Sequence, residues 1–103
     1  MTYEILTSSE FVQWREGLRD VTAQAAIERY LDRISQGNLG YTRQVAGDIY
    51  EKKINVSGGY RLYYFVRVKH VIVMLTGGTK RTQKRDIKKA MEIRKGLYDN
   101  DIT

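Results

Sequence analysis

Residues 58–65 of this chain read Gly-Gly-Tyr-Arg-Leu-Tyr-Tyr-Phe, and they decide its fold together with Leu-Thr-Gly-Gly-Thr-Lys-Arg-Thr-Gln (75–83) and Asp-Ile-Lys-Lys-Ala (86–90). The first segment predicts a turn that opens onto a strand carrying Arg61. In the second, the glycine pair predicts a strand end and a corner, after which Lys80 and Arg81 lead into a basic helix. We therefore expect positive side chains from separate elements to meet at one end of the fold.

The rest of the chain supplies a short first strand, two helices and two further strands. Hydrophobic spacing and capping residues predict these elements in order: a strand at 3–6, a helix after the capping signature 7–10, a helix that Asp20 caps and Gly37 ends, strands at 49–56, 60–68 and 71–75, and a helix after Thr82. The order predicts an α+β fold with a short N-terminal strand, a helical hairpin packed on an antiparallel β-sheet, and a C-terminal helix. With 103 residues and no Pro-rich linker, residues 1–103 are expected to form a single domain.

The basic residues are concentrated in one half of the chain. Residues 1–46 hold 5 Lys/Arg and 6 Asp/Glu, whereas residues 47–103 hold 13 Lys/Arg and 6 Asp/Glu, a net charge of +7. Such a distribution favours a polyanion, and nucleic acid before membrane, because no apolar segment accompanies the charge. The alternative is that the charge serves solubility only.

Several cations are candidates for binding a phosphate. Arg61 lies one residue inside its strand, where its planar guanidinium could bond two phosphate oxygens at once. In simple register Lys53 approaches it across the hairpin, while Lys80, Arg81 and the Gln83 amide follow the glycine corner at a helix N-terminus. Each could equally be a solvated surface residue, and the helix cations, which include Lys84, are most simply a solvated face. Tyr63 either stacks on bases or packs beneath a helix, and the sequence leaves both open.

Other chemistries find no support. The chain has no cysteine and one histidine, so neither a thiolate nucleophile, a zinc site nor a Ser–His triad is expected, and no metal or other cofactor is needed. No apolar run is long enough to span a membrane, and the first residues do not resemble a leader peptide. A cytoplasmic protein without membrane contact is the resulting expectation.

The same segments resemble the RelE/ParE superfamily of toxins, and within it the addiction module killer proteins related to HigB. The specific part is Gly-Gly-x-Lys-x-x-Gln-x-x-Asp-Ile-x-x-Ala, which begins at Gly77, preceded by Gly-Tyr-Arg at 59–61. Glu-Lys-Lys-Ile at 51–54 stands where the family commonly has Glu-Leu-Arg-Ile. The resemblance runs nearly from end to end of the chain.

This resemblance implies a bacterial toxin of a type II toxin–antitoxin pair, often encoded on a prophage. It implies a ribosome-dependent endoribonuclease (an mRNA interferase) that inhibits translation, in which the substrate 2′-hydroxyl attacks the adjacent phosphate without a metal. The implied partners are a helix-turn-helix antitoxin, the ribosome with its mRNA, and operator DNA only through the antitoxin complex. At the matching positions of this chain the resemblance implies that Arg61 holds the scissile phosphate, Lys53 orients the 2′-hydroxyl and Lys80 stabilises the negative charge. The candidate substrate-binding residues are Arg81, Gln83, Tyr63 and Lys84.

The chain also departs from the family. RelE has a tyrosine in its C-terminal segment where this chain reads Asp86-Ile87, and the HigB histidines have no counterparts, so the general acid stays unassigned. Two alternatives to the ribonuclease therefore remain: a non-enzymatic inhibitor of DNA gyrase, as ParE-like members are, and an inactive prophage remnant of the fold.

Overall fold

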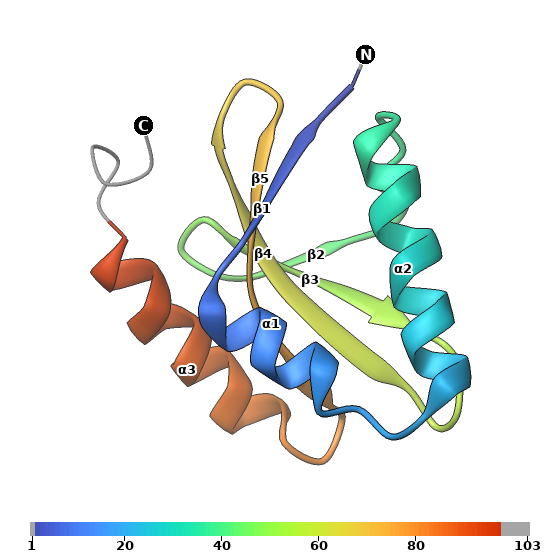
Figure 1. Cartoon of the computed structure of the whole chain (residues 1–103). Coiled ribbons are helices and arrows are strands. Elements are labelled where there is room, and N and C mark those ends of the chain that lie inside the picture. Colours follow the sequence, from blue (N-terminus) through green and yellow to red (C-terminus); the bar gives the residue numbers. More distant parts are fainter. Residues whose placement is uncertain (1, 98–103) are drawn as a thin grey trace.

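The computed structural model describes residues 2–97 of the chain. Its elements follow one another as Figure 1 shows: β1 (Glu4–Thr7), α1 (Ser9–Glu16), α2 (Val21–Ser35), β2 (Arg43–Ala46), β3 (Ile49–Ile54), β4 (Tyr60–Val68), β5 (Val71–Thr79) and α3 (Gln83–Gly96). This order confirms the predicted α+β fold. It adds one strand, β2, that the sequence pattern did not predict.

The strands form one five-stranded sheet in the order β1-β5-β4-β3-β2. The pairs β2–β3, β3–β4 and β4–β5 are antiparallel, as predicted for β3 to β5, whereas β1 lies parallel to β5 at one edge. The expectation of a wholly antiparallel sheet is thus wrong for β1. Its direction depends on how α1 and α2 return the chain across the sheet, which local sequence does not encode.

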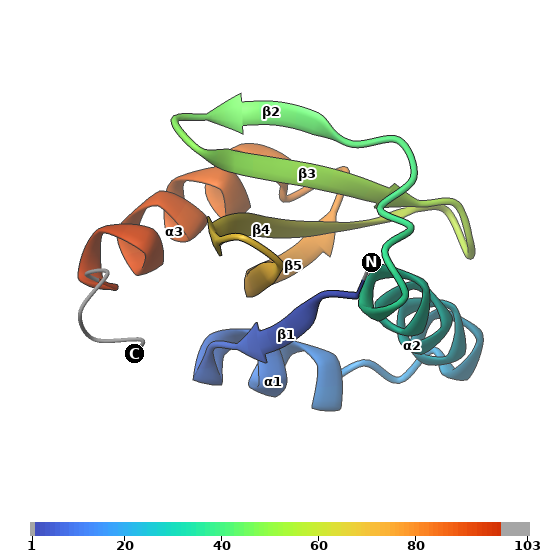
Figure 2. The ribbon, with the colours of Figure 1, turned by 90° about the horizontal axis from the view of Figure 1, so that it is seen from above.

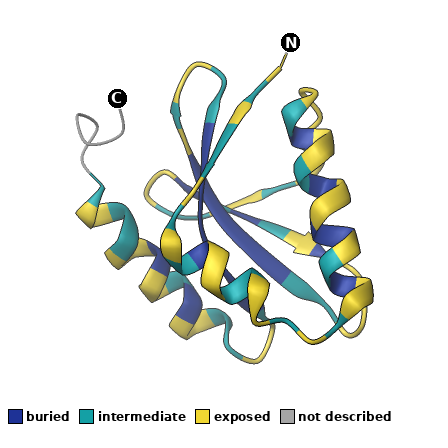
Figure 3. Ribbon diagram, viewed as in Figure 1, coloured by how far each residue is buried: buried dark blue, intermediate teal, exposed yellow. Residues whose placement is uncertain are grey.

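The helices cover both faces of the sheet. Figure 2 shows α1 and α2 on one side and α3 on the other. Strand β4 alternates between them, as the period of a strand requires: Leu62 and Tyr64 pack with residues of α1 and α2, while Tyr63 and Phe65 pack with Ala90 of α3. The central strands are buried along most of their length (Figure 3), and this alternation is the one predicted from the sequence.

The helix ends largely follow the predicted signals. The Asp20 carboxylate accepts from the Ala23 N–H at 3.0 Å and so caps α2, and Gly37, with φ 97°, ends that helix in the left-handed region. Helix α1 differs by one residue, because Ser8 rather than Thr7 is its N-cap and accepts from the Phe11 N–H at 2.9 Å.

The glycine pair of β5 has a different role from the one predicted. Strand β5 does not stop there but continues through Gly77 and Gly78 to Thr79. A Cβ atom on Gly77 would overlap with the Trp14 ring on the α1 side, and one on Gly78 would overlap with the Asp86 carboxylate on the α3 side. The pair therefore lets both layers approach the backbone, and the corner follows it.

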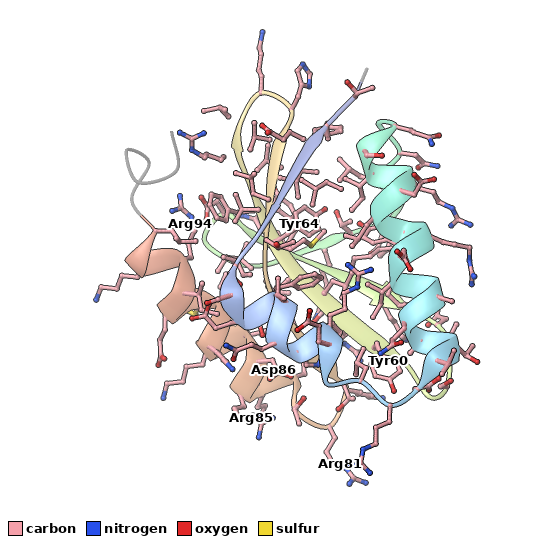
Figure 4. All side chains as sticks on the ribbon, viewed as in Figure 1. Tyr60, Tyr64, Arg81, Arg85, Asp86 and Arg94 are labelled. Atoms are coloured by element: carbon pink, nitrogen blue, oxygen red, sulfur yellow. The ribbon has the colours of Figure 1, made fainter. Side chains whose placement is uncertain are left out.

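Helix α3 is fastened to the sheet at both ends. Near its C-terminus the Arg94 guanidinium contacts Asp48 at 2.9 Å and lies over the Phe65 ring at 3.9 Å. At its N-terminus the Gln83 amide donates to Glu51 of β3 at 2.8 Å, and the buried Asp86, labelled in Figure 4, accepts a hydrogen bond from the Thr82 hydroxyl at the helix start. Within residues 2–97, no helix has the length and apolar character needed to cross a membrane.

Candidate functional site

The hairpin of β3 and β4 brings two of the predicted site residues together. Lys53 and Arg61 are direct cross-strand partners in the antiparallel register. Because opposite residues of a sheet share a face, both lie on the α3 side, near the start of β4. This register is the one that the predicted approach of Lys53 to Arg61 required.

Arg61 is held in an unusual environment for a cation. Its side chain is only 8% exposed, and its Nε lies 3.5 Å from Oε2 of Glu51, whose side chain is 6% exposed. Among the described residues, Nε and Nη1 of Arg61 are buried without a hydrogen-bond partner. Buried donors are normally satisfied, so these two nitrogens are an unusual feature of the site, and the Glu51 carboxylate is the ionic partner of Nε.

Glu51 is the centre of the polar contacts around Arg61. Its Oε1 lies 3.2 Å from Nη2 of Arg43 on β2, and its Oε2 accepts from the Gln83 amide at 2.8 Å. Gln83 is the first residue of α3, so the carboxylate joins β2, β3, β4 and the helix start. These contacts fix the base of the site on regular elements rather than on loops.

A pocket of about 280 Å³ opens above this cluster. The residues that line it are Tyr41, Arg43, Glu51, Lys53, Arg61 and Gln83. Three cations and one carboxylate give the lining a formal charge of +2, and Lys53 is exposed at its rim. Such a lining favours an anion the size of a phosphate group.

Lys80 and Arg81 line a neighbouring pocket instead. It has a volume of about 320 Å³ and lies between the β3–β4 turn and the β5–α3 corner; its lining residues are Ser57, Gly58, Gly59, Tyr60, Thr79, Lys80 and Arg81. Figure 4 shows Tyr60 and Arg81 at the same end of the molecule. Burial and the nearby Asp20 carboxylate raise the pKa of Tyr60. The predicted cations are thus divided between two pockets rather than gathered in one.

Two of the candidate substrate-binding residues do not line either pocket. Tyr63 is completely buried in the cluster beneath α3, so of its two alternatives the structure shows packing and leaves its ring no access to a base. Burial, and after it the Glu51 charge, raise the pKa of Tyr63 above its ordinary range, and the ring stays neutral. Lys84 is exposed on α3 outside both pockets.

Sequence reasoning missed three residues of the first pocket. Glu51 was read as part of a strand motif, although a carboxylate at an inward strand position two residues before Lys53 was a sign of a buried ion pair. Arg43 was missed with β2 itself. Tyr41 lies in the loop before β2 and gave no periodic signal, yet it is 83% exposed at the pocket.

The arrangement can hold a phosphodiester and stabilise added negative charge on it. The Arg61 guanidinium is positioned by Glu51 and lines the pocket, and Lys53 supplies an exposed ammonium beside it. No group of three or more His, Cys, Asp or Glu side chains within residues 2–97 could hold a metal ion. The chemistry available to these residues is electrostatic stabilisation by fixed cations.

Comparison with protein families places this geometry in a known group. Residues 18–96 match the model of the phage-derived Gp49-like proteins (DUF891). The chain belongs to the Gp49-like family. A relative from Haemophilus influenzae, an uncharacterised protein, is 36% identical over 90 residues, which cover 87% of this chain and 91% of that protein.

Solved structures show that this Gp49-like chain has the fold of RelE toxins. A mutant of the Escherichia coli toxin RelE in the free state superimposes with a TM-score of 0.71 at 20% identity, covering 89% of this chain and 97% of that one. RelE in the intact E. coli RelBE toxin–antitoxin complex gives a TM-score of 0.59 at 21% identity, covering 75% and 95%. The fold that the sequence resemblance implied is confirmed.

Proposed function

We propose that this protein is the toxin of a type II toxin–antitoxin system and that it cleaves mRNA on the ribosome. The observation that carries the proposal is Arg61, a largely buried cation that Glu51 holds at the base of a pocket whose formal charge is +2. Membership of the Gp49-like family and the RelE fold support it, and RelE toxins are known in complexes with antitoxins. A cognate antitoxin is therefore the expected protein partner.

In the proposed reaction the substrate supplies its own nucleophile. The 2′-oxygen forms a bond to the adjacent phosphorus while the bond from phosphorus to the 5′-oxygen breaks, giving a 2′,3′-cyclic phosphate and a 5′-hydroxyl. Arg61 binds the non-bridging oxygens, whose negative charge grows in the transition state. Lys53, exposed at the rim, orients the 2′-hydroxyl and offsets the charge that develops as its proton passes to solvent, while the departing 5′-oxygen takes a proton from solvent.

Lys80 and Arg81 have a supporting role in this scheme. Their pocket is lined by Tyr60, which precedes Arg61 on β4, and the two side chains face opposite sides of the sheet at the start of that strand. In this scheme RNA that extends around the end of the sheet from a phosphate at Arg61 presents another phosphate to Lys80 and Arg81. Ribosomal RNA would complete the alignment, because the small cationic surface cannot order a long substrate alone.

Induced expression tests the proposal. We expect growth arrest that co-expression of the adjacent antitoxin gene relieves, and primer extension should show discrete, translation-dependent cuts in mRNA. Arg61→Met should abolish the cuts while the protein remains folded by circular dichroism. Intact transcripts with induction of DNA-damage signalling would instead support the gyrase alternative, and the absence of any arrest would support an inactive remnant.

A further inference from the structure

We infer that Tyr41 is a nucleobase-binding platform for the RNA whose phosphate occupies the Arg61 pocket. The inference rests on the proposed function and adds to it the kind of group, a nucleobase, that binds beside the phosphate. Tyr41 lines the same pocket as Arg61, Lys53 and Arg43, so an aromatic ring and phosphate-binding cations share one surface. Single-stranded RNA is bound in this way, by cations along the backbone and aromatic rings on which bases stack.

The exposure of Tyr41 is exceptional among the aromatic residues that the structure describes. Its residue is 83% exposed, and the other large hydrophobic residues found exposed within residues 2–97 are all aliphatic: Val12, Val21, Val66, Val68 and Met91. Tyr63 and Tyr64 are buried, so the ring available for stacking at the pocket is that of Tyr41. A tyrosine left in water at a cationic pocket gives the fold no packing energy and is suited to a flat ligand.

The loop that carries Tyr41 is fixed in place. The Lys52 ammonium donates to the Tyr41 carbonyl at 3.2 Å and lies over the Tyr30 ring of α2, 5.3 Å from its centroid. The Asn38 side chain accepts from the Gly40 N–H at 3.2 Å, and Gly40 adopts a positive φ of 66°. A platform with a restrained backbone loses little conformational freedom when a base stacks on it.

Lys52 lies on the opposite face of the sheet from the pocket. Alternation along β3 puts it on the α2 side, whereas Glu51 and Lys53 face α3. It is a positioning residue for Tyr41 and lines neither pocket, and its substitution should weaken base binding without removing a phosphate contact.

Tryptophan fluorescence tests the platform directly. Tyr41→Trp places a reporter at the pocket, Val68→Trp places one at the far end of β4 as the matched control, and the wild type reports Trp14 alone. The probe is a short single-stranded 2′-O-methyl oligoribonucleotide, which cannot be cleaved, compared with the same backbone made abasic. We expect quenching only in Tyr41→Trp, with about 5- to 100-fold weaker binding of the abasic probe.

Cleavage in a translating extract gives the second readout. Tyr41→Phe should cut as the wild type does, Tyr41→Ala should cut about 5- to 100-fold more slowly, and Lys52→Met should fall between them. Equal losses in Tyr41→Phe and Tyr41→Ala would overturn stacking, because they would assign the effect to the hydroxyl. Equal affinity for both probes, no quenching at residue 41, or an effect of Tyr41→Ala on antitoxin binding alone would overturn it too.

The two proposals fail in different ways. If the wild type makes no cuts but the tryptophan at residue 41 responds to bases, the cleavage proposal is wrong and the platform stands. If the wild type and Tyr41→Ala cut at the same rate, and the reporter is silent, the platform is wrong and the cleavage proposal stands.

Discussion

The two faces of the sheet differ in what covers the start of β4. On the α1–α2 side Leu62 is completely buried among apolar residues, including Phe11 and Ile27. On the α3 side the neighbouring residue, Arg61, is also buried, but α3 begins beside it with Gln83 and leaves a polar pocket. Two adjacent residues of one strand are thus both buried, one among apolar side chains and the other in a polar cluster. One closed face stabilises the fold, and the incomplete cover of the other creates the candidate site.

Substitution of Arg61 should give the largest effect, and this effect should be a loss of activity. Arg61→Lys keeps a cation beside Glu51 but loses the fork that binds two phosphate oxygens, so we expect cleavage in a translating extract to slow by about 100- to 1,000-fold. Thermal unfolding should change little. Arg33→Lys on the exposed side of α2 is the matched control and should cut normally. Cleavage by Arg61→Lys at the wild-type rate would contradict the functional difference between the faces.

Substitution of Leu62 should lower the stability of the fold instead of the activity. Leu62→Ala removes buried methyl groups and leaves a cavity, so the free energy of unfolding should drop by about 2–5 kcal/mol in a urea titration. The cutting rate per folded molecule should stay at the wild-type value below the unfolding temperature. A specific loss of cutting in folded Leu62→Ala would show that the closed face takes part in function.

At the glycine pair of β5, the close approach of α1 on one face can be compared with that of α3 on the other. Gly77→Ala drives a methyl group into Trp14, and Gly78→Ala drives one into Asp86; each should lower the free energy of unfolding by about 1–3 kcal/mol. Gly96→Ala, where an added Cβ meets nothing within 4 Å, is the control. Unchanged stability in Gly77→Ala would refute the close approach of α1, and unchanged stability in Gly78→Ala that of α3.

Alkaline pH should produce the smallest effect, through tyrosines on both faces. Burial first of all raises the pKa of Tyr63 on the α3 side and of Tyr64 on the α1–α2 side. A raised pKa in the folded state means that stability is complete below the unfolded value of about 10 and falls as the pH rises above it. Tyr63→Phe should make this fall shallower in urea titrations at increasing pH. An identical fall in Tyr63→Phe and wild type would contradict the assignment.

The sequence predicted what depends on local pattern. The alternation of β4, the Asp20 cap and the pairing of Lys53 with Arg61 follow from strand period, capping chemistry and a short turn, and all three are found. The candidate catalytic roles of Lys53, Arg61 and Lys80 stay predictions. So do the substrate contacts assigned to Arg81, Gln83 and Lys84.

What the sequence could not predict depends on contacts between distant segments. Strand β2 is short and largely polar and becomes a strand only because β3 pairs with it. The glycine pair looked like a breaker because a missing Cβ marks both a turn and a close approach, and only the positions of Trp14 and Asp86 distinguish them. Likewise, Tyr63 is buried because α3 packs on its face of β4, which the sequence of the strand alone does not show.

Analysis of the fragment ends made by the wild type in a translating extract tests the central claim most directly. The claim is that the pocket at Arg61 holds a phosphate while the neighbouring 2′-hydroxyl attacks it. The account predicts a 2′,3′-cyclic phosphate on the upstream fragment and a 5′-hydroxyl on the downstream one, with no fragments from Arg61→Met. Downstream fragments that carry a 5′-phosphate, or identical fragments from Arg61→Met, would contradict it.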